Sequence, residues 1–183
     1  SAGVNVIGFW ERGEFTISAP DAVINPNSVL LLAGSKETLA RFDSKYRNAH
    51  NREGHTVVIG AGRVGTAVCE TLASNNTDYK IVDRSPHELK PFGDKGVIGD
   101  ASTFETLNMA GIIEARTVII TSHDDALEVY LTIFCRKLRP DIQIICRATE
   151  VRTISELHRA GADIVLSYAS MGANILFNFL KHS

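Results

Sequence analysis

Residues 55–65 read His-Thr-Val-Val-Ile-Gly-Ala-Gly-Arg-Val-Gly, an apolar run that leads into three glycines with the spacing Gly-x-Gly-x-x-Gly. The next residues, 66–73, place apolar side chains at helical spacing. Gly60 allows a tight turn, Gly62 lets the backbone approach a ligand, and Gly65 lets a helix pack closely on a strand. The stretch therefore predicts a strand at 55–60, a glycine-rich turn and a helix at 63–74.

An acidic residue, Asp83, closes the next apolar run. With the glycines before it, this acid completes the fingerprint of a dinucleotide-binding unit, in which phosphates meet a helix N-terminus and a carboxylate binds the ribose hydroxyls. Asp83 would repel a 2′-phosphate, which favours NAD(H), AMP, ADP or ATP over NADP. Arg84 could pair with a phosphate or stack on adenine. The alternative is a glycine-rich turn that binds no ligand.

The composition is that of an ordinary globular protein: 183 residues, 44% hydrophobic and 22% charged, with a net charge of −2. That charge gives no argument for a nucleic-acid partner. No apolar run approaches the roughly 20 residues that span a bilayer, and no signal peptide is visible. The three cysteines lie in apolar patterns without Cys-x-x-Cys spacing, so we expect them to be buried and not to bind metal: Cys69, Cys135 and Cys146.

Strands and helices alternate strictly after residue 54, which predicts an α/β fold with a Rossmann-like, doubly wound parallel sheet. We expect strands at 55–60, 79–83, 96–98, 117–121, 143–147 and 164–166, and helices at 63–74, 86–92, 103–109, 124–138, 151–160 and 170–181. Residues 1–46 predict a small β-rich α+β segment, with strands at 4–10, 14–18 and 29–33 and a helix at 36–46. The polar residues 47–54 predict a linker.

Ligands of doubly wound sheets bind beyond the carboxyl ends of the strands. The candidate binding residues are therefore those that follow or end strands: Gly60, Ala61, Gly62, Arg63, Val64, Gly65, Asp83, Arg84, Gly99, Asp100, Ala101, Thr121, Ser122, His123 and Arg147. Arg63 could contact a phosphate or reach a neighbouring subunit's ligand. Arg147 places a charge on an otherwise apolar strand, which a phosphate or an inter-subunit carboxylate would explain.

Several of these polar residues have a simpler structural alternative. Asp100 or Ser102 could cap the next helix, and Ser122 could cap the helix that begins near 124. The run His123-Asp124-Asp125 suggests acid–base chemistry, but acids in a helix's first turn are favoured by the dipole without any function.

With these motifs in place, the chain resembles the RCK (regulator of potassium conductance) domain, which also occurs in Trk and Ktr potassium-uptake subunits. The similarity lies in Val57–Gly65, Ile81–Asp83, Gly99–Ala101, Val118–Thr121, Asp124-Asp125, Ile144–Ala148 and Leu157–Val165. The run Ala160-Gly-Ala-Asp163 before the sixth strand is its most specific part. Residues 1–46 resemble, more weakly, the C-terminal lobe of a preceding RCK unit, so that 55–183 would be the nucleotide-binding N-lobe of the next.

The resemblance implies a regulatory module on the cytoplasmic side of the cell membrane and not an enzyme. Such domains form homodimers and larger rings, tetramers or octamers of lobes, beneath a membrane pore, and ligand binding to the ring moves the gate. NAD(H) is the first expected ligand. Calcium-gated members place acids on the fifth strand, where this chain has Arg147 and Thr149, so no calcium site of that type is expected.

Two other functions stay open at this point: a fragment of an NAD-dependent oxidoreductase, and an interaction module with a vestigial nucleotide fold. A dehydrogenase needs a substrate domain and a positioned acid or base. Residues 169–181 carry apolar side chains at helical spacing, and we expect them to pack on the neighbour in a two-fold homodimer. The alternative is packing as the last helix of the chain's own sheet.

Overall fold

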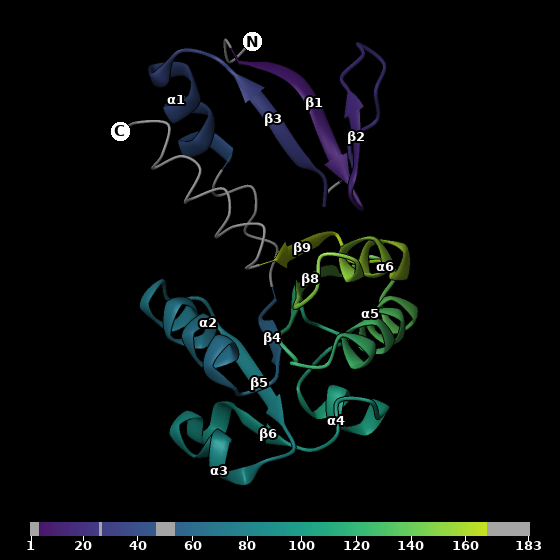
Figure 1. The fold of residues 1–183 in the computed structure, drawn as a ribbon. Helices are drawn as coiled ribbons and strands as arrows, with labels where there is room; N and C mark the ends of the chain where they lie inside the picture. Colours follow the sequence, from purple (N-terminus) through teal and green to yellow (C-terminus); the bar gives the residue numbers. More distant parts are fainter. Residues whose placement is uncertain (1–3, 26, 47–53, 168–183) are drawn as a thin grey trace, which may run out of the picture. The chain divides into compact units, whose positions relative to one another are not determined.

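The computed structural model describes residues 4–25, 27–46 and 54–167, which belong to two compact units, 1–53 and 54–183 (Figure 1). All but the last residue of the predicted linker, and the whole helix predicted at 170–181, lie outside the described residues. Within the described ranges, no helix has the length and apolarity needed to cross a membrane.

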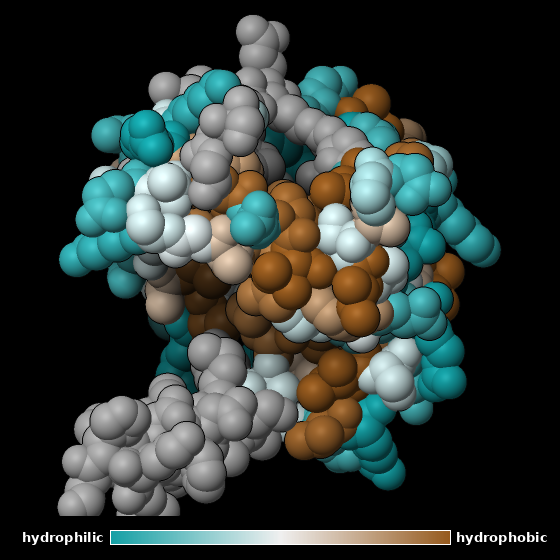
Figure 2. All heavy atoms as spheres, turned by 90° about the horizontal axis from the view of Figure 1, so that it is seen from above, coloured by the Kyte–Doolittle hydropathy of each residue, from teal (hydrophilic) through white to brown (hydrophobic). Residues whose placement is uncertain are grey.

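The first unit is a three-stranded antiparallel sheet of order β2-β1-β3, followed by one helix. Its elements are β1 (Asn5–Glu11), β2 (Glu14–Ile17), β3 (Val29–Ala33) and α1 (Lys36–Tyr46). Arg12 and Gly13 both adopt positive φ, as a two-residue hairpin turn requires. Trp10 and Phe15 form a cross-strand pair with ring centroids 4.5 Å apart. Both rings are partly exposed. Figure 2 shows apolar side chains, in brown, gathered on the face of the molecule that is seen from above.

The second unit contains a six-stranded parallel sheet of order β6-β5-β4-β7-β8-β9. The strands are β4 (Thr56–Ile59), β5 (Tyr79–Asp83), β6 (Gly96–Ile98), β7 (Thr117–Ile120), β8 (Gln143–Ala148) and β9 (Ile164–Ser167). The strand order reverses between β4 and β7, which is the topology of a doubly wound Rossmann-like sheet. The predicted fold class is therefore confirmed, with strand ends within one residue of those expected.

Helices cover both faces of this sheet (Figure 1). They are α2 (Arg63–Ser74), α3 (Pro86–Leu89), the 3-10 helix η2 (Lys90–Lys95), α4 (Phe104–Met109), α5 (Asp125–Leu138) and α6 (Thr153–Ala160). One core packs β-strand side chains against α2 and α3, and a second packs them against α4, α5 and α6. The helix expected at 86–92 ends earlier, because Pro91 cannot continue an α-helix. The three cysteines are buried, and burial raises the pKa of each thiol to about 12.

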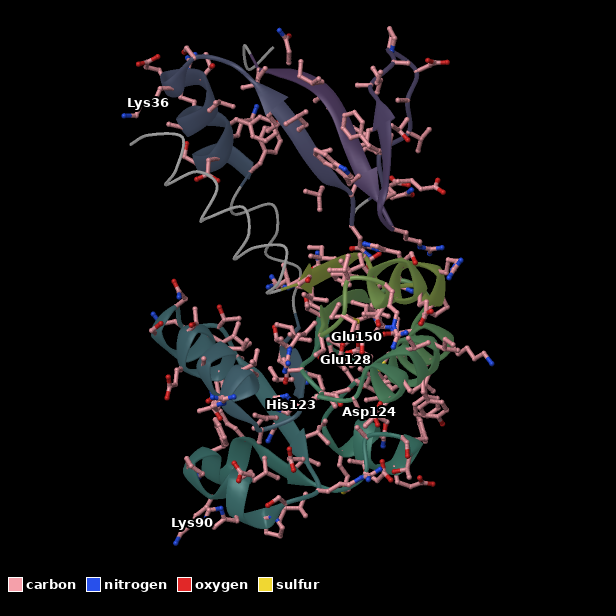
Figure 3. All side chains as sticks on the ribbon, in the orientation of Figure 1. Lys36, Lys90, His123, Asp124, Glu128 and Glu150 are labelled. Carbon is pink, nitrogen blue, oxygen red and sulfur yellow. The ribbon has the colours of Figure 1, made fainter. Side chains whose placement is uncertain are left out.

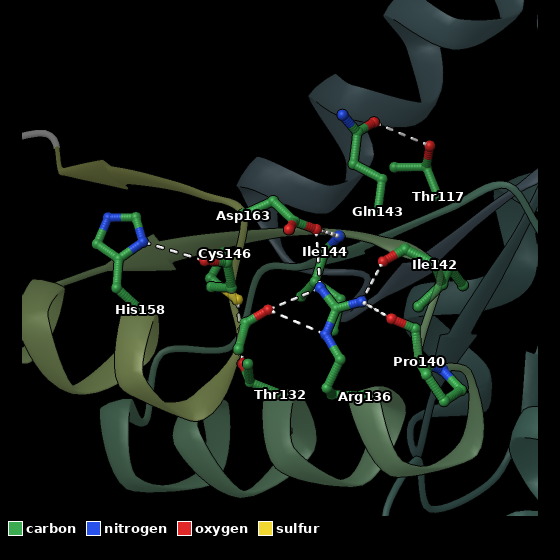
Figure 4. Close-up of polar contacts among 12 residues, drawn as sticks. Thr117, Thr132, Arg136, Pro140, Ile142, Gln143, Ile144, Cys146, His158 and Asp163 are labelled. Atoms are coloured by element: carbon green, nitrogen blue, oxygen red, sulfur yellow. Dashed lines mark hydrogen bonds and ion pairs between the residues drawn. The ribbon is translucent and has the colours of Figure 1, made fainter. Parts of the chain in front are cut away.

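A largely buried ion pair joins α5 to the start of β8 and β9 (Figure 4). Arg136 Nη2 lies 2.9 Å from Asp163 Oδ2, which also accepts a hydrogen bond of 2.8 Å from the N–H of Ile144. The same guanidinium donates to the carbonyl oxygens of Pro140, Ile142 and Gly161. Gly161 ends α6 in the left-handed conformation. Residues 160–163 thus form the turn that leads into β9, and the contacts of Arg136 with Gly161 and Asp163, here called the clamp, hold this turn against α5.

We expect Arg136→Ala to lower the free energy of unfolding by about 3 kcal/mol, because Asp163 is left as an unpaired, largely buried charge. Denaturant unfolding followed by circular dichroism measures the change. The control is Arg159→Ala, which removes an exposed guanidinium from α6 and should change stability by about 0.5 kcal/mol or less. Equal losses in the two variants would contradict a structural role for the clamp.

Candidate nucleotide-binding site

The glycine loop lies between the end of β4 and the start of α2. Gly60 has a φ of +101°, which favours glycine, and its N–H donates to the carbonyl of Val82 over 2.8 Å. A Cβ on Gly65 would lie only 1.8 Å from the carbonyl oxygen of Gly60. The first turn of α2 therefore crosses directly against the loop, and any side chain at Gly65 would push it away.

Gly62 has a different role, because its backbone conformation is open to any residue. It is the N-cap of α2, with φ −69° and ψ −175°. A Cβ added there would lie 3.3 Å from Nε2 of His123. The missing side chain thus keeps open the space between the N-terminus of α2 and the histidine ring. This is where the free N–H groups and positive dipole end of the helix would meet a phosphate.

Asp83, at the end of β5, is held against the glycine loop by two backbone hydrogen bonds. Its Oδ2 accepts from the N–H of Ala61 at 2.7 Å, and its Oδ1 accepts from the N–H of Ser85 at 2.8 Å. Each carboxylate oxygen can accept more than one hydrogen bond. The fixed carboxylate therefore retains acceptor capacity for two ribose hydroxyls.

Arg84 and Asp100 pair with each other at the rim of the site. Arg84 Nη2 lies 2.7 Å from Asp100 Oδ2, and the N–H of Ser102 donates to Asp100 Oδ1 at 2.9 Å. The hydrogen bond from Arg84, with that from Ser102, lowers the pKa of Asp100 to about 2. Neither Asp100 nor Ser102 caps the next helix: Thr103 is the N-cap of α4.

The two residues flanking Asp100 serve the loop and the core. The N–H of Gly99 donates to the carbonyl of Asp83 at 2.9 Å, and Ala101 packs against the larger core. These contacts fix the loop after β6 beside the end of β5. Both residues therefore lie beside Asp83, at the carboxyl edge of the sheet.

Thr121 and Ser122 follow β7 but turn their side chains toward the backbone. The hydroxyl of Thr121 is buried within hydrogen-bond distance of the carbonyl oxygens of Ile59 and Gly60, at 3.0 and 3.1 Å. Ser122 Oγ accepts from the N–H of Asp124 at 3.1 Å. The cap of α5 is Asp124, which accepts from the N–H groups of two residues in the first turn. The alternative of a Ser122 cap was therefore wrong.

Asp125 also has a structural role. Its carboxylate accepts hydrogen bonds from the N–H groups of Thr149 and Glu150, both at 3.1 Å, and from the hydroxyl of Thr153 at 2.7 Å. Burial raises the pKa of Asp125, but these hydrogen bonds outweigh it and the net pKa is lowered. Asp125 thus ties α5 to the loop after β8. Acid–base chemistry by the pair of aspartates has no support in this geometry.

His123 and Arg147 meet in front of the glycine loop. Arg147 Nη1 lies 3.0 Å from Nδ1 of His123. A guanidinium can only donate, so Nδ1 is the acceptor and the ring hydrogen lies on Nε2, the atom nearest Gly62. Both residues line an open groove of about 660 Å³ along α2, whose other walls are Arg63, Val64, Ala67, Val68, Thr71 and Leu72. The groove places an N–H donor and two cations beside the helix N-terminus.

Glu128 is a residue of this region that the sequence analysis did not select. It lies on α5 (Figure 3). Its side chain is fully buried, and neither carboxylate oxygen has a hydrogen-bond partner within the described ranges. Burial raises its pKa to about 9; Asp125 acts in the same direction and Arg147 opposes it. The available signal was its place on the inward face of α5, at helical spacing from Leu131, Thr132 and Cys135.

The structure thus brings most of the predicted residues to one edge of the sheet. The glycine loop, Asp83, Thr121, His123 and Arg147 are linked by the contacts described above, while Arg84 and Asp100 form a separate pair at the rim. Among the residues whose placement is described, no three histidine, cysteine or acidic side chains cluster as metal ligands would. The edge can supply backbone N–H groups and cations to an anion, and a carboxylate to hydroxyls.

Comparison with known proteins agrees with this geometry. The family model of the TrkA-N domain matches residues 56–168. The chain belongs to the TrkA-N domain family. Probable potassium channel protein 2 of Methanocaldococcus jannaschii is 32% identical over 143 residues, which are 75% of this chain and 42% of the relative. The chain therefore spans less than half of that relative's length.

Solved structures extend the similarity of this TrkA-N chain to RCK domains. The crystal structure of the GsuK RCK domain is 37% identical, with a TM-score of 0.71, and the match covers 99% of this chain and 39% of that one. The GsuK channel bound to NAD matches at 38% identity and a TM-score of 0.70, over 99% and 33% of the two chains. GsuK bound to ADP matches at 36% and 0.63, over 79% and 39%. The predicted resemblance to RCK domains is confirmed.

Glu128→Gln should stabilise the TrkA-N unit at alkaline pH. The pKa of Glu128 is about 9 in the folded protein, against an ordinary value of 4.5. The folded state therefore holds this proton more tightly than the unfolded state, and Glu128 removes stability as the pH rises through that window. Glutamine has no proton to lose. At pH 8 we expect the variant to gain up to about 4 kcal/mol, because about 3.5 pH units separate this pH from the ordinary pKa of the unfolded state.

Thermal unfolding at pH 8 and near pH 4.5 tests this expectation, since the gain should vanish at the lower pH. Glu150→Gln, which changes an exposed carboxylate in the same region, is the control and should show no such dependence. A Glu128→Gln protein that is less stable than the native chain at both pH values would contradict the buried, protonated state.

Proposed function

We propose that this chain is a ligand-sensing regulatory domain of a potassium channel or potassium-transport protein, and that it binds an adenine nucleotide. NAD(H) is the favoured ligand, with AMP, ADP or ATP as alternatives. The observation that carries the proposal is the glycine loop, whose N–H groups and open space at Gly62 stand beside the fixed carboxylate of Asp83. The similar GsuK structures with NAD and with ADP support it.

In this proposal, different residues at the carboxyl edge of the sheet bind different parts of the nucleotide. The phosphates lie at the N-terminus of α2, against Gly62, where Arg63, Arg147 and Nε2 of His123 can donate to them. The ribose hydroxyls donate to Asp83. The fit follows from Gly62 itself, since even one added carbon would fill the space before His123. The backbone around the site is braced before any ligand arrives.

We infer a binding role and not a catalytic one. Asp124 caps α5 and Asp125 ties three groups of the loop after β8, so neither carboxylate is positioned to exchange protons with a ligand. This weighs against the alternative of an NAD-dependent oxidoreductase fragment, which would require a positioned acid or base near the transferred hydride.

The wider assembly is part of the same proposal. Residues 1–46 would be the C-terminal lobe of a preceding RCK unit, 47–54 a linker, and 55–183 the nucleotide-binding N-lobe of the next. The domain would lie on the cytoplasmic side of the cell membrane beside a pore domain. Homodimers within a ring, a tetramer or octamer of lobes, would couple nucleotide binding to gating of K⁺ flux.

Calorimetry with NADH, ADP and ATP should give a saturable heat for at least one of them. Gly62→Val should abolish that heat and leave the fold intact, because the backbone at Gly62 tolerates any residue while the side chain fills the phosphate space. Ala73→Val adds bulk at an exposed position on the same helix and should bind normally. Silence from all three ligands, or full affinity in a folded Gly62→Val protein, would overturn the proposed site.

The dimer is tested by light scattering at high protein concentration. We expect the native chain to be a two-fold homodimer and a chain truncated after Leu166 to be a monomer, because the apolar residues 169–181 would pack on the neighbour. Circular dichroism controls for folding of the truncated chain. A monomeric native chain would refute the dimer, and a dimeric truncation would place the interface elsewhere.

A further inference from the structure

A buried carboxyl group without hydrogen-bond donors is unusual, and Glu128 is one. Its side chain is fully buried, and both oxygens lack a partner in the part of the chain that the structure describes. An ionised carboxylate in that position would have lost its water without any compensating donor. The favoured state is therefore the neutral acid, which requires only that a proton be bound.

The charged and titratable groups around Glu128 come from two elements. Asp125, on the same helix, raises the pKa of Glu128, and Arg147, on β8, lowers it. Cys146, also on β8, faces the same helix through Thr132, at 3.1 Å from its hydroxyl, but its thiol stays neutral with a pKa of about 12. From α6, Thr153 contributes only a hydroxyl, which donates to Asp125. Within the described part of the chain, Arg147 is thus the group that favours the ionised form of Glu128.

Arg147 is also one of the two cations at the candidate ligand groove. Its Nη1 lies 3.0 Å from His123, and both residues line the groove beside Arg63. One guanidinium therefore influences the buried carboxyl of Glu128 and belongs to the edge where phosphates would bind. An anion bound in the groove would partly neutralise the positive charge of Arg147. It would also make the electrostatic potential at Glu128 more negative. Both effects favour the protonated acid.

We propose that Glu128 is a buried proton-binding group linked to the ligand site, so that binding of an anionic nucleotide at alkaline pH is accompanied by partial uptake of a proton from solvent onto its carboxylate. This inference rests on the proposed nucleotide site. The step is a simple protonation: solvent supplies the proton, an O–H bond forms on Glu128, and no other bond changes. Arg147 acts as the connecting charge between the ligand and the acid.

Coulomb's law gives the expected shift in the pKa of Glu128 when the ligand binds. A unit negative charge about 10 Å away, at an effective dielectric constant of about 20, shifts a pKa by on the order of one unit. Starting from a pKa of about 9, such a shift gives uptake of about 0.4 protons per ligand near pH 9, and almost none near pH 7. The same linkage weakens binding about threefold between roughly pH 8 and 9.5.

The test is calorimetry with NADH in two buffers of different ionisation enthalpy, at about pH 7 and about pH 9. The pyrophosphate of NADH does not titrate in this range, so a buffer-dependent heat reports protons taken up by the protein. We expect buffer dependence at the higher pH only. Glu128→Gln should bind NADH without it, and Glu150→Gln, an exposed neighbour on the loop after β8, should retain it.

The outcomes separate the two proposals. No heat with NADH in either buffer, together with silence from ADP and ATP, would overturn the nucleotide site itself. Binding with equal heats in both buffers near pH 9, or proton uptake that persists in Glu128→Gln, would overturn the role of Glu128 while leaving the site intact. Should the glutamine variant fail to fold, the affinity of the native chain decides: a threefold decline toward pH 9.5 supports the linkage, and a flat affinity overturns it.

Discussion

The close crossing of α2 over the glycine loop is the constraint on which the rest of the site depends. Gly65 approaches the carbonyl of Gly60 so closely that a Cβ would lie 1.8 Å from it. The hydroxyl of Thr121 braces the same carbonyl from β7. With the helix held there, its N-terminal N–H groups and dipole point to the carboxyl edge of the sheet.

The strand ends hold the site through backbone contacts. Asp83 binds the N–H of Ala61, Thr121 binds loop carbonyls, and Asp125 binds the loop after β8. Side chains that look like candidate ligand contacts thus first organise the chain around them. A substitution at one of these positions changes loop geometry as well as any direct contact. Fewer groups are directed at the groove than the strand ends suggest. They are the backbone N–H groups of the helix start, Arg63, His123 and Arg147.

The sequence predicted the sheet, its helices and the grouping of the strand ends, because periodicity and parallel topology determine these. It could not choose among adjacent polar residues at a helix start. Ser122 and Asp124 are both acceptable caps, as are Asp100 and Thr103, and the choice depends on backbone angles that only the folded chain defines. The sequence does not mark Glu128 as unusual, because glutamates on helices are ordinarily exposed. Only its position on the inward face of α5 distinguishes it.

Charge is distributed unevenly along this edge of the sheet, with one end negative and the other positive. Arg84 is paired with Asp100, so the rim carries little net charge, and the carboxylate of Asp83 leaves the end beside β5 negative. At neutral pH Glu128 is protonated, because its pKa is about 9, and it therefore does not cancel Arg147. The groove end, with Arg63 and Arg147, is positive. A ligand with phosphates at one end and an unphosphorylated ribose at the other matches this polarity in one orientation only. In the proposed site, a buried acid would thus contribute to recognition by being neutral.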